Sequence, residues 1–205
     1  MTEDELAANP LNPDAASVTI IEVPHGQSVD AETVEAALEQ HKPKWAFMAH
    51  WETGSGRIND MRGFSEACLR HGAMGLVDAV SSLGVADFAI DDFPGVVGWA
   101  SCPQKGVACL PLTYAPVSFT DAYIETLKST GAYTYVHNPI FEARHWGIVD
   151  GQDVEKGTYH RTHSAYAVSA FHEALRITFD ANGVFQQIAD NKQSSVFNTR
   201  KKSRQ

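Results

Sequence analysis

The 205-residue sequence predicts an α/β fold in which a parallel or mixed sheet lies between two layers of helices. Short, continuous apolar runs at 74–77 and 96–100 are typical of parallel strands that are buried on both faces. These runs alternate with amphipathic segments, which is the pattern of strand–helix–strand units. Polar residues follow the runs directly, at the edge of the sheet where open parallel sheets bind their ligands.

The first elements follow one another closely along the chain. Val18–Val23 is rich in β-branched residues and is expected to form a strand. Ala31–His41 carries apolar residues at helical spacing, and Asp30 is placed to cap the first turn of this helix. The apolar run Trp45–His50 then predicts the next strand.

The middle of the chain continues the alternation. Asp60–His71 is amphipathic and predicts a helix, with Gly72 as a natural C-terminal stop. The run that begins at Met74 predicts a strand that ends at Asp78. A further strand is expected over Val96–Ala100.

The last third of the chain has weaker signals. Tyr114–Ser118 is expected to form a strand and Thr120–Ser129 a short helix. Gly131–Gly157 is aromatic and irregular without clear periodicity, so no element is expected there. Ser164–Asn182 has an apolar stripe that predicts a long amphipathic helix, packed in the core or against another subunit.

Composition limits the classes of function. The formal net charge of −9 argues against nucleic acid or an anionic membrane surface as a partner, and no apolar run approaches membrane-spanning length. The three cysteines are an odd number without metal-ligand spacing, which favours a cytoplasmic location over a disulfide framework. The histidines are scattered, so no metal site is expected.

Three regions are expected along the chain. Residues 1–17 are polar and contain two prolines, so they are expected to form a loose N-terminal segment. Residues 18–191 contain all the expected helices and strands. Residues 192–205 end in a basic cluster and are expected to be a disordered tail.

Asp78 and Lys105 are the candidate catalytic pair. Each follows an apolar strand, so both side chains are expected at the same edge of the sheet. Pyridoxal phosphate chemistry needs a lysine that forms a Schiff base with the cofactor aldehyde and a carboxylate that pairs with the protonated pyridine nitrogen. Taken alone, each residue has an ordinary explanation, because an aspartate after a strand is often a helix cap and a lysine there is often simply exposed.

Four motifs in a fixed order strengthen this interpretation. They are His-Trp-Glu-Thr-Gly-Ser-Gly at 50–56, Val-Asp-Ala-Val-Ser-Ser-Leu-Gly at 77–84, Pro-Gln-Lys at 103–105 and Tyr-His-Arg-Thr at 159–162. With these motifs the chain resembles the class V, fold-type I aminotransferases, and most closely their alanine–glyoxylate and serine–glyoxylate branch. The resemblance covers about residues 18–191 and implies the three-layer sheet of the large cofactor-binding domain of these pyridoxal phosphate enzymes, present in part.

The resemblance implies roles for the residues around the cofactor ring. Lys105 would hold pyridoxal 5'-phosphate as a Schiff base and then act as general base for the proton shift. Asp78 would pair with the ring nitrogen, and the branched side chain of Val80 would pack on one face of the ring.

Other residues match contacts of the cofactor's phosphate side. Thr53 would donate its hydroxyl to the 3-oxygen region or the phosphate side, and Gln104 would bind the phosphate through its amide. Tyr159 and Thr162 match residues that reach the phosphate of the neighbouring subunit. The resemblance therefore implies a homodimer.

The implied function is transamination between a small amino acid of the alanine or serine type and a 2-oxo acid such as glyoxylate or pyruvate. One alternative is a truncated, catalytically weak or silent homologue that serves as an interaction subunit or is the product of a decayed gene. Family members are roughly twice as long, and neither their phosphate-holding turn nor their substrate-binding arginine matches a position here. A second alternative is a lyase of the cysteine desulfurase type, against which Gln104 argues, because those enzymes usually carry His-Lys at this strand.

The sequence departs from the family pattern around the lysine. Pro103 stands where the family has a serine that can form a hydrogen bond. The loop after Lys105 lacks the Pro-Pro-Gly ending of the family, whose glycine allows close approach of the backbone. Both changes bear on the shape of the site.

Overall fold

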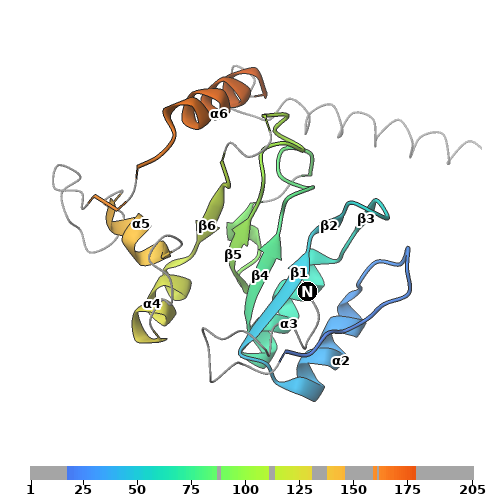
Figure 1. Cartoon of the computed structure of the whole chain (residues 1–205). Coiled ribbons are helices and arrows are strands. Elements are labelled where there is room, and N and C mark those ends of the chain that lie inside the picture. Colours follow the sequence, from blue (N-terminus) through green and yellow to red (C-terminus); the bar gives the residue numbers. More distant parts are fainter. Residues whose placement is uncertain are drawn as a thin grey trace, which may run out of the picture.

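The computed structural model describes residues 18–86, 89–110, 114–130, 138–145, 159–160 and 162–178. Its main sheet has four strands in the order β1-β4-β5-β6 (Figure 1). Their bounds are Trp45–Ala49, Met74–Asp78, Val96–Ala100 and Val117–Phe119. β1, β4 and β5 are parallel, whereas β6 is antiparallel to β5, so the predicted α/β fold with a mixed sheet is confirmed.

A short hairpin leaves the main sheet after β1. It consists of β2 (Trp51–Glu52) and β3 (Arg57–Ile58), which pair antiparallel. The buried side chain of Asn59 secures the base of the hairpin, because its Nδ2 donates to the carbonyl of Ala49 at 2.7 Å and its Oδ1 accepts from the N–H of Val29 at 2.8 Å.

Helices α2 (Ala31–His41) and α3 (Met61–His71) begin at aspartate caps, as expected for short polar side chains at a helix N-terminus. Asp30 Oδ1 accepts from the N–H of Thr33, and Asp60 Oδ1 accepts from the N–H of Gly63, both at 2.9 Å. The predicted helix stop is also present, since Gly72 adopts the left-handed conformation with φ of 66°.

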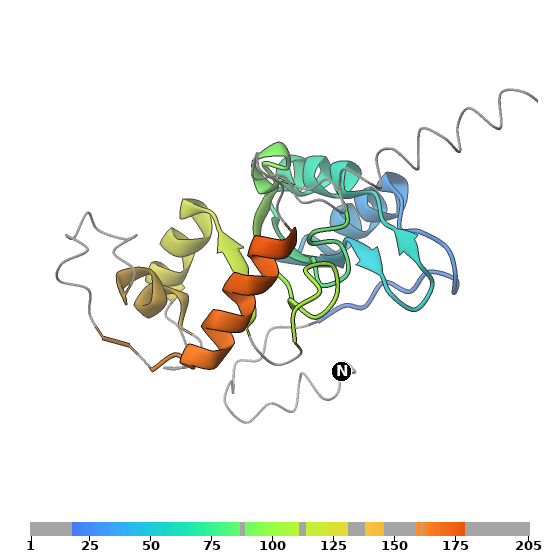
Figure 2. The ribbon, with the colours of Figure 1, turned by 90° about the horizontal axis from the view of Figure 1, so that it is seen from above.

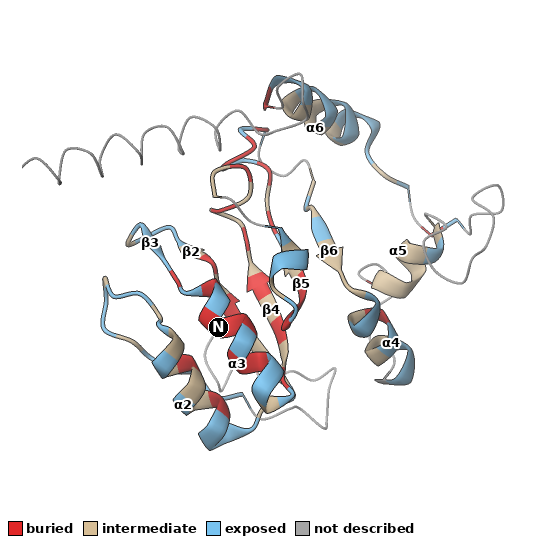
Figure 3. Cartoon of the chain, turned by 180° about the vertical axis from the view of Figure 1, so that it is seen from behind, coloured by how far each residue is buried: buried red, intermediate tan, exposed pale blue. Residues whose placement is uncertain are grey.

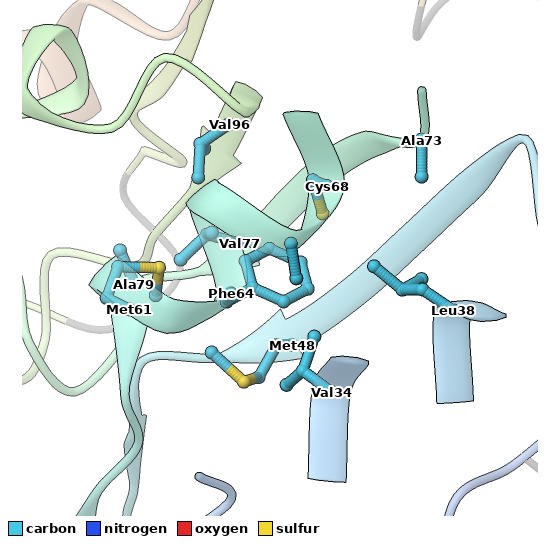
Figure 4. Packing of buried hydrophobic residues seen from close by; sticks show 11 residues of the cluster. Val34, Leu38, Met48, Met61, Phe64, Cys68, Ala73, Val77, Ala79 and Val96 are labelled. Atoms are coloured by element: carbon cyan, nitrogen blue, oxygen red, sulfur yellow. The ribbon is translucent and has the colours of Figure 1, made fainter. Parts of the chain in front are cut away.

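The hydrophobic core lies between these two helices and one face of the sheet (Figure 4). Buried residues gather where α2 and α3 face the strands (Figure 3). The cluster contains Val34, Leu38, Met48, Met61, Phe64, Ala67, Cys68, Ala73, Val77, Ala79 and Val96. Burial raises the pKa of the Cys68 thiol to about 11, so this cysteine behaves as a packing residue.

Among the described elements, α4 (Asp121–Thr130) packs on the opposite face of the sheet through Tyr123. Tyr123 stacks on Phe119 with ring centroids 4.4 Å apart and meets Trp45 edge-on at 5.7 Å. Phe47, on the outer strand β1, remains 71% exposed. Figure 2 shows that α4 is well separated from α2 and α3 across the molecule.

The C-terminal helix α6 (Ala165–Thr178) lies apart from the core (Figure 1). Phe171 stacks on Tyr114 at 5.6 Å, and this ring pair connects the helix to the segment before β6. Tyr166 on the same helix is 90% exposed. Among the described helices, none combines the length and the apolar character needed to cross a membrane.

Two expectations about secondary structure were wrong. Residues 18–23 form no strand, and they pair with no strand of the described sheets. Conversely, a helix that was not expected, α5 (Pro139–His145), follows Asn138, whose Oδ1 accepts from the N–H of Ile140 at 3.0 Å. Several expectations fall outside the described residues: the loose segment 1–17, most of the irregular region 131–157, residues 179–182 of the expected long helix, and the tail 192–205.

Candidate active site

Three loops meet at the carboxyl ends of the parallel strands. They are the turn of the β2–β3 hairpin, the turn after β4 and the loop after β5, and Figure 1 shows them at the same end of the sheet. Each loop contributes one polar side chain to a cluster, namely Thr53, Ser81 and Lys105. The cluster therefore forms where open parallel sheets bind their ligands.

Lys105 is the cation of this cluster. Its Nζ donates to Thr53 Oγ1 at 2.6 Å and to Ser81 Oγ at 3.2 Å. The two hydroxyl groups also share a hydrogen bond with each other. Within the described part of the chain no carboxylate pairs with the Lys105 amine, so the amine is held by neutral partners only.

The hairpin turn that carries Thr53 is shaped by Glu52. Glu52 Oε1 accepts from the N–H of Gly54 at 2.7 Å, and its carbonyl accepts from the N–H of Gly56 at 2.8 Å. At the base of the hairpin, the N–H of His50 donates to the carbonyl of Asp78 at 2.9 Å. Burial lowers the pKa of His50, which favours a neutral imidazole packed beneath the site.

Asp78 is the half-buried carboxylate at the end of β4. Its Oδ1 accepts from the N–H of Val80 at 2.7 Å. In the described residues no cation pairs with this side chain, and its second oxygen forms no hydrogen bond. Asp78 therefore offers a free acceptor for a cationic partner.

The loop that carries Lys105 is packed directly on the turn that carries Ser81. A Cβ atom built on Gly106 would lie 1.9 Å from the carbonyl oxygen of Leu83, so only glycine fits this contact. The loop closes through hydrogen bonds from the N–H of Cys109 to the carbonyl of Pro103 and from the N–H of Ala108 to the carbonyl of Lys105, both at 2.9 Å. Close backbone approach is thus provided by a glycine next to the lysine, although the family's later glycine is missing.

Comparisons with known proteins find similarity to one family of enzymes. The family model for class V aminotransferases matches residues 6–94. Alanine–glyoxylate aminotransferase of Oryctolagus cuniculus is 30% identical over 154 residues, which are 74% of this chain and 38% of the relative. The enzyme of the same name from Callithrix jacchus is 34% identical over 149 residues, 70% of this chain and 34% of the relative.

A solved structure extends the similarity to three dimensions. The crystal structure of an alanine–glyoxylate aminotransferase from Nostoc sp. superimposes with a TM-score of 0.73 and 30% identity, and the match covers 90% of this chain and 46% of that one. The chain is therefore similar to class V aminotransferases in part of its sequence and in its fold. It spans about 38% of the length of the Oryctolagus relative.

Class V aminotransferases use pyridoxal phosphate, and the residues of this site fit that cofactor. The group needs an amine for its aldehyde, a carboxylate for its ring nitrogen and donors for its oxygens. The sheet edge presents the amine of Lys105, the free oxygen of Asp78 and the hydroxyl of Thr53.

Of the remaining residues of the class V pattern, two lie in the loops that form the cluster and two lie away from it. Gln104 is exposed beside Lys105, and in the described residues its amide forms no hydrogen bond. Val80 is half-buried in the turn after Asp78. Tyr159 and Thr162 bond to one another through their hydroxyls, and no described contact joins them to the Lys105 cluster.

Ser81 lies within the motif at 77–84 but was not predicted to be a site residue. Ser81 is the first residue after Asp78 with a hydrogen-bonding side chain. It could have been found from this place, because it follows a strand that ends at the same sheet edge. Its hydroxyl reaches both Lys105 and Thr53. The sequence alone gives no distance between residues that are 24 and 28 positions apart.

Proposed function

We propose that this chain catalyses pyridoxal phosphate-dependent transamination between a small amino acid, of the alanine or serine type, and a 2-oxo acid such as glyoxylate or pyruvate. The observation that carries the proposal is the Lys105 amine, held by two hydroxyls and free of any described carboxylate, at the same sheet edge as the unpaired Asp78. Relatives that share this part of the chain are named alanine–glyoxylate aminotransferases.

In this proposal, Lys105 and Asp78 bind the cofactor, and Lys105 also transfers a proton. When bound, pyridoxal phosphate supplies an electron sink that stabilises negative charge on the substrate α-carbon. Lys105 would hold the cofactor covalently and, once displaced by substrate, would use Nζ to take and return the α-proton. Asp78 would keep a proton on the ring nitrogen through its free oxygen.

Phosphate binding is assigned to Gln104 from one subunit and to Tyr159 and Thr162 from a neighbouring one, and Thr53 is assigned to the 3-oxygen region or the phosphate side. Tyr159 is 68% exposed, so its side chain is accessible to a second subunit. The proposed active form is therefore a homodimer.

A cytoplasmic location is part of the proposal. In the described residues, none of Cys68, Cys102 and Cys109 forms a disulfide. Free thiols persist in a reducing compartment.

Covalent attachment of the cofactor is the direct test. We would add pyridoxal phosphate to the purified chain, follow the absorbance, reduce with borohydride and locate the added mass by peptide mass spectrometry. The proposal expects the cofactor on Lys105, and expects Lys105→Ala to lose both the absorbance change and the adduct. Lys44→Ala, at an exposed lysine, is the matched control and should keep both. An adduct that persists in Lys105→Ala would refute the assignment.

A catalytically weak homologue is the second candidate, and one observation favours it. In the described residues no arginine contacts the Lys105 cluster. Two of the described arginines form ion pairs elsewhere, Arg70 with Glu35 and Arg176 with Glu173. An arginine that binds the substrate carboxylate in two hydrogen bonds contributes several kcal/mol, on the order of 2–5. This second candidate predicts turnover of alanine or serine with glyoxylate below about 1 per second, and a rate of about 1–1000 per second would exclude it.

A further inference from the structure

Ser81 belongs to the Lys105 cluster without a role in the proposed function. Its hydroxyl is 3.2 Å from Lys105 Nζ and shares a hydrogen bond with the hydroxyl of Thr53. We propose that Ser81 is a positioning residue, which together with Thr53 holds the free Lys105 amine where it attaches to the cofactor and exchanges protons. The inference rests on the proposed function, because Lys105 is the proposed site of attachment.

The hydrogen-bonding capacity of a hydroxyl pair suits this task. An ammonium group has three donors and no acceptor, whereas a neutral amine also has a lone pair that accepts a proton. The hydroxyls of Thr53 and Ser81 can accept from the ammonium, and either can turn to donate to the amine. A carboxylate could only accept, and would favour the charged form. The two hydroxyls can therefore hydrogen-bond to Lys105 both as the protonated ammonium and as the neutral amine, the two forms that a general base adopts.

The backbone around Ser81 is fixed, so its distance to Lys105 is set by the fold. The N–H of Ala79 donates to the carbonyl of Ala100 at 2.8 Å, and Ser101 Oγ donates to the carbonyl of Ala79 at 3.0 Å. These bonds tie the start of the turn to the strand and loop that lead to Lys105. At the other end of the turn, Leu83 packs against Gly106.

The neighbouring serine provides a matched control on the same turn. Ser82 is fully buried, and in the described residues its Oγ has no hydrogen-bond partner. Ser82→Ala removes this hydroxyl without touching the Lys105 cluster. It should leave the fold intact, because an unsatisfied buried hydroxyl contributes little or nothing to stability.

The experiment compares wild type, Ser81→Ala, Ser81→Thr and Ser82→Ala in two assays. The first measures the rate at which added pyridoxal phosphate attaches, by absorbance. The second uses protein without cofactor and measures acetylation of Lys105 by acetic anhydride relative to Lys44, by mass spectrometry. Losing one hydrogen bond changes a rate about fivefold, so Ser81→Ala should attach cofactor about fivefold more slowly and be acetylated faster by a similar factor. Ser81→Thr should restore both rates, and Ser82→Ala should match wild type.

The outcomes separate this inference from the proposed function. If wild type attaches the cofactor and Ser81→Ala does so equally fast, the positioning role is wrong and the proposed function stands. Equal slowing in Ser81→Ala and Ser82→Ala would also overturn the role, because the effect would belong to the turn as a whole. If wild type attaches no cofactor, the proposed function fails. The acetylation assay then decides, since a change confined to Ser81→Ala supports the contact and no change overturns it.

Discussion

Gly106 and Leu83 bring the two halves of the candidate site into direct backbone contact. A Cβ atom on the glycine would lie 1.9 Å from the Leu83 carbonyl oxygen. The loop that carries Lys105 and the turn that carries Ser81 can approach this closely only because position 106 has no side chain. The geometry of the polar cluster therefore depends on a residue that offers no functional group.

Gly106→Ala should separate the loop from the turn. We expect a loss of stability of about 1–3 kcal/mol, as for other overpacked positions, together with loss of covalent cofactor attachment. Denaturant unfolding and the borohydride assay measure the two effects. Ala108→Gly is the control in the same loop, because Ala108 has φ of 54° and glycine relieves that strain. Wild-type attachment in Gly106→Ala would show that the contact is dispensable.

Asp78→Asn should preserve the fold and impair the chemistry. The amide oxygen can still accept from the N–H of Val80, so thermal unfolding should be unchanged. Transamination should fall by several orders of magnitude, because a ring nitrogen without its proton makes a poor electron sink. Steady-state turnover with alanine and glyoxylate measures the loss, with Asp121→Asn, at an exposed residue, as control. A loss smaller than tenfold would argue against the pairing.

The free energy of unfolding should depend on pH because of the ionisation of Glu35. Glu35 binds Arg70 Nη2 at 2.5 Å and His71 Nε2 at 2.8 Å, and these contacts, Arg70 first, lower its pKa from 4.5 to about 2. Because folding lowers the pKa of Glu35, its ionised carboxylate stabilises the fold above about pH 4.5. This contribution to the free energy of unfolding is lost as the pH falls toward 2.

Urea unfolding of wild type and Glu35→Gln at several pH values between 6 and 2 tests this linkage. The difference in unfolding free energy should be constant above about pH 4.5 and should shrink below it. Glu39→Gln, on the same helix, should show a smaller dependence. A difference between wild type and Glu35→Gln that is unchanged down to pH 2 would rule out the linkage.

The chain should self-associate. Tyr159 and Tyr166 are 68% and 90% exposed, and a second subunit would cover such aromatic surface. Sedimentation velocity at tens of micromolar should show a dimer, and Tyr166→Glu should weaken it. A strict monomer under these conditions would remove the proposed phosphate contacts between subunits.

The parallel strands and the placement of Asp78 and Lys105 at their ends could be predicted from the sequence. Runs such as 74–77 are short, apolar and followed by polar residues, so both element type and ligand edge could be inferred from them. The order of the strands in the sheet and the hydrogen-bond partners of Lys105 could not be predicted from the sequence, because they depend on contacts between residues far apart in the chain.

Secondary structure predicted from local sequence was wrong in two segments. Residues 18–23 have β-branched composition, but Ile20 and Ile21 are exposed, and β propensity forms a strand only where another strand is available to pair. Helix α5 was missed, although Asn138 before Pro139 is a helix-start signal. A seven-residue helix is too short to show periodicity.

The separation of the cluster residues along the chain has a consequence for folding kinetics. Thr53 and Lys105 are 52 positions apart, and their hydrogen bond joins loops that follow β1 and β5, two strands that lie on either side of β4 in the sheet. Contacts of high sequence separation form late, after the local helices and turns. After dilution from denaturant, helical circular dichroism should therefore recover before the chain regains the ability to capture pyridoxal phosphate, and the lag would time the last step of assembly.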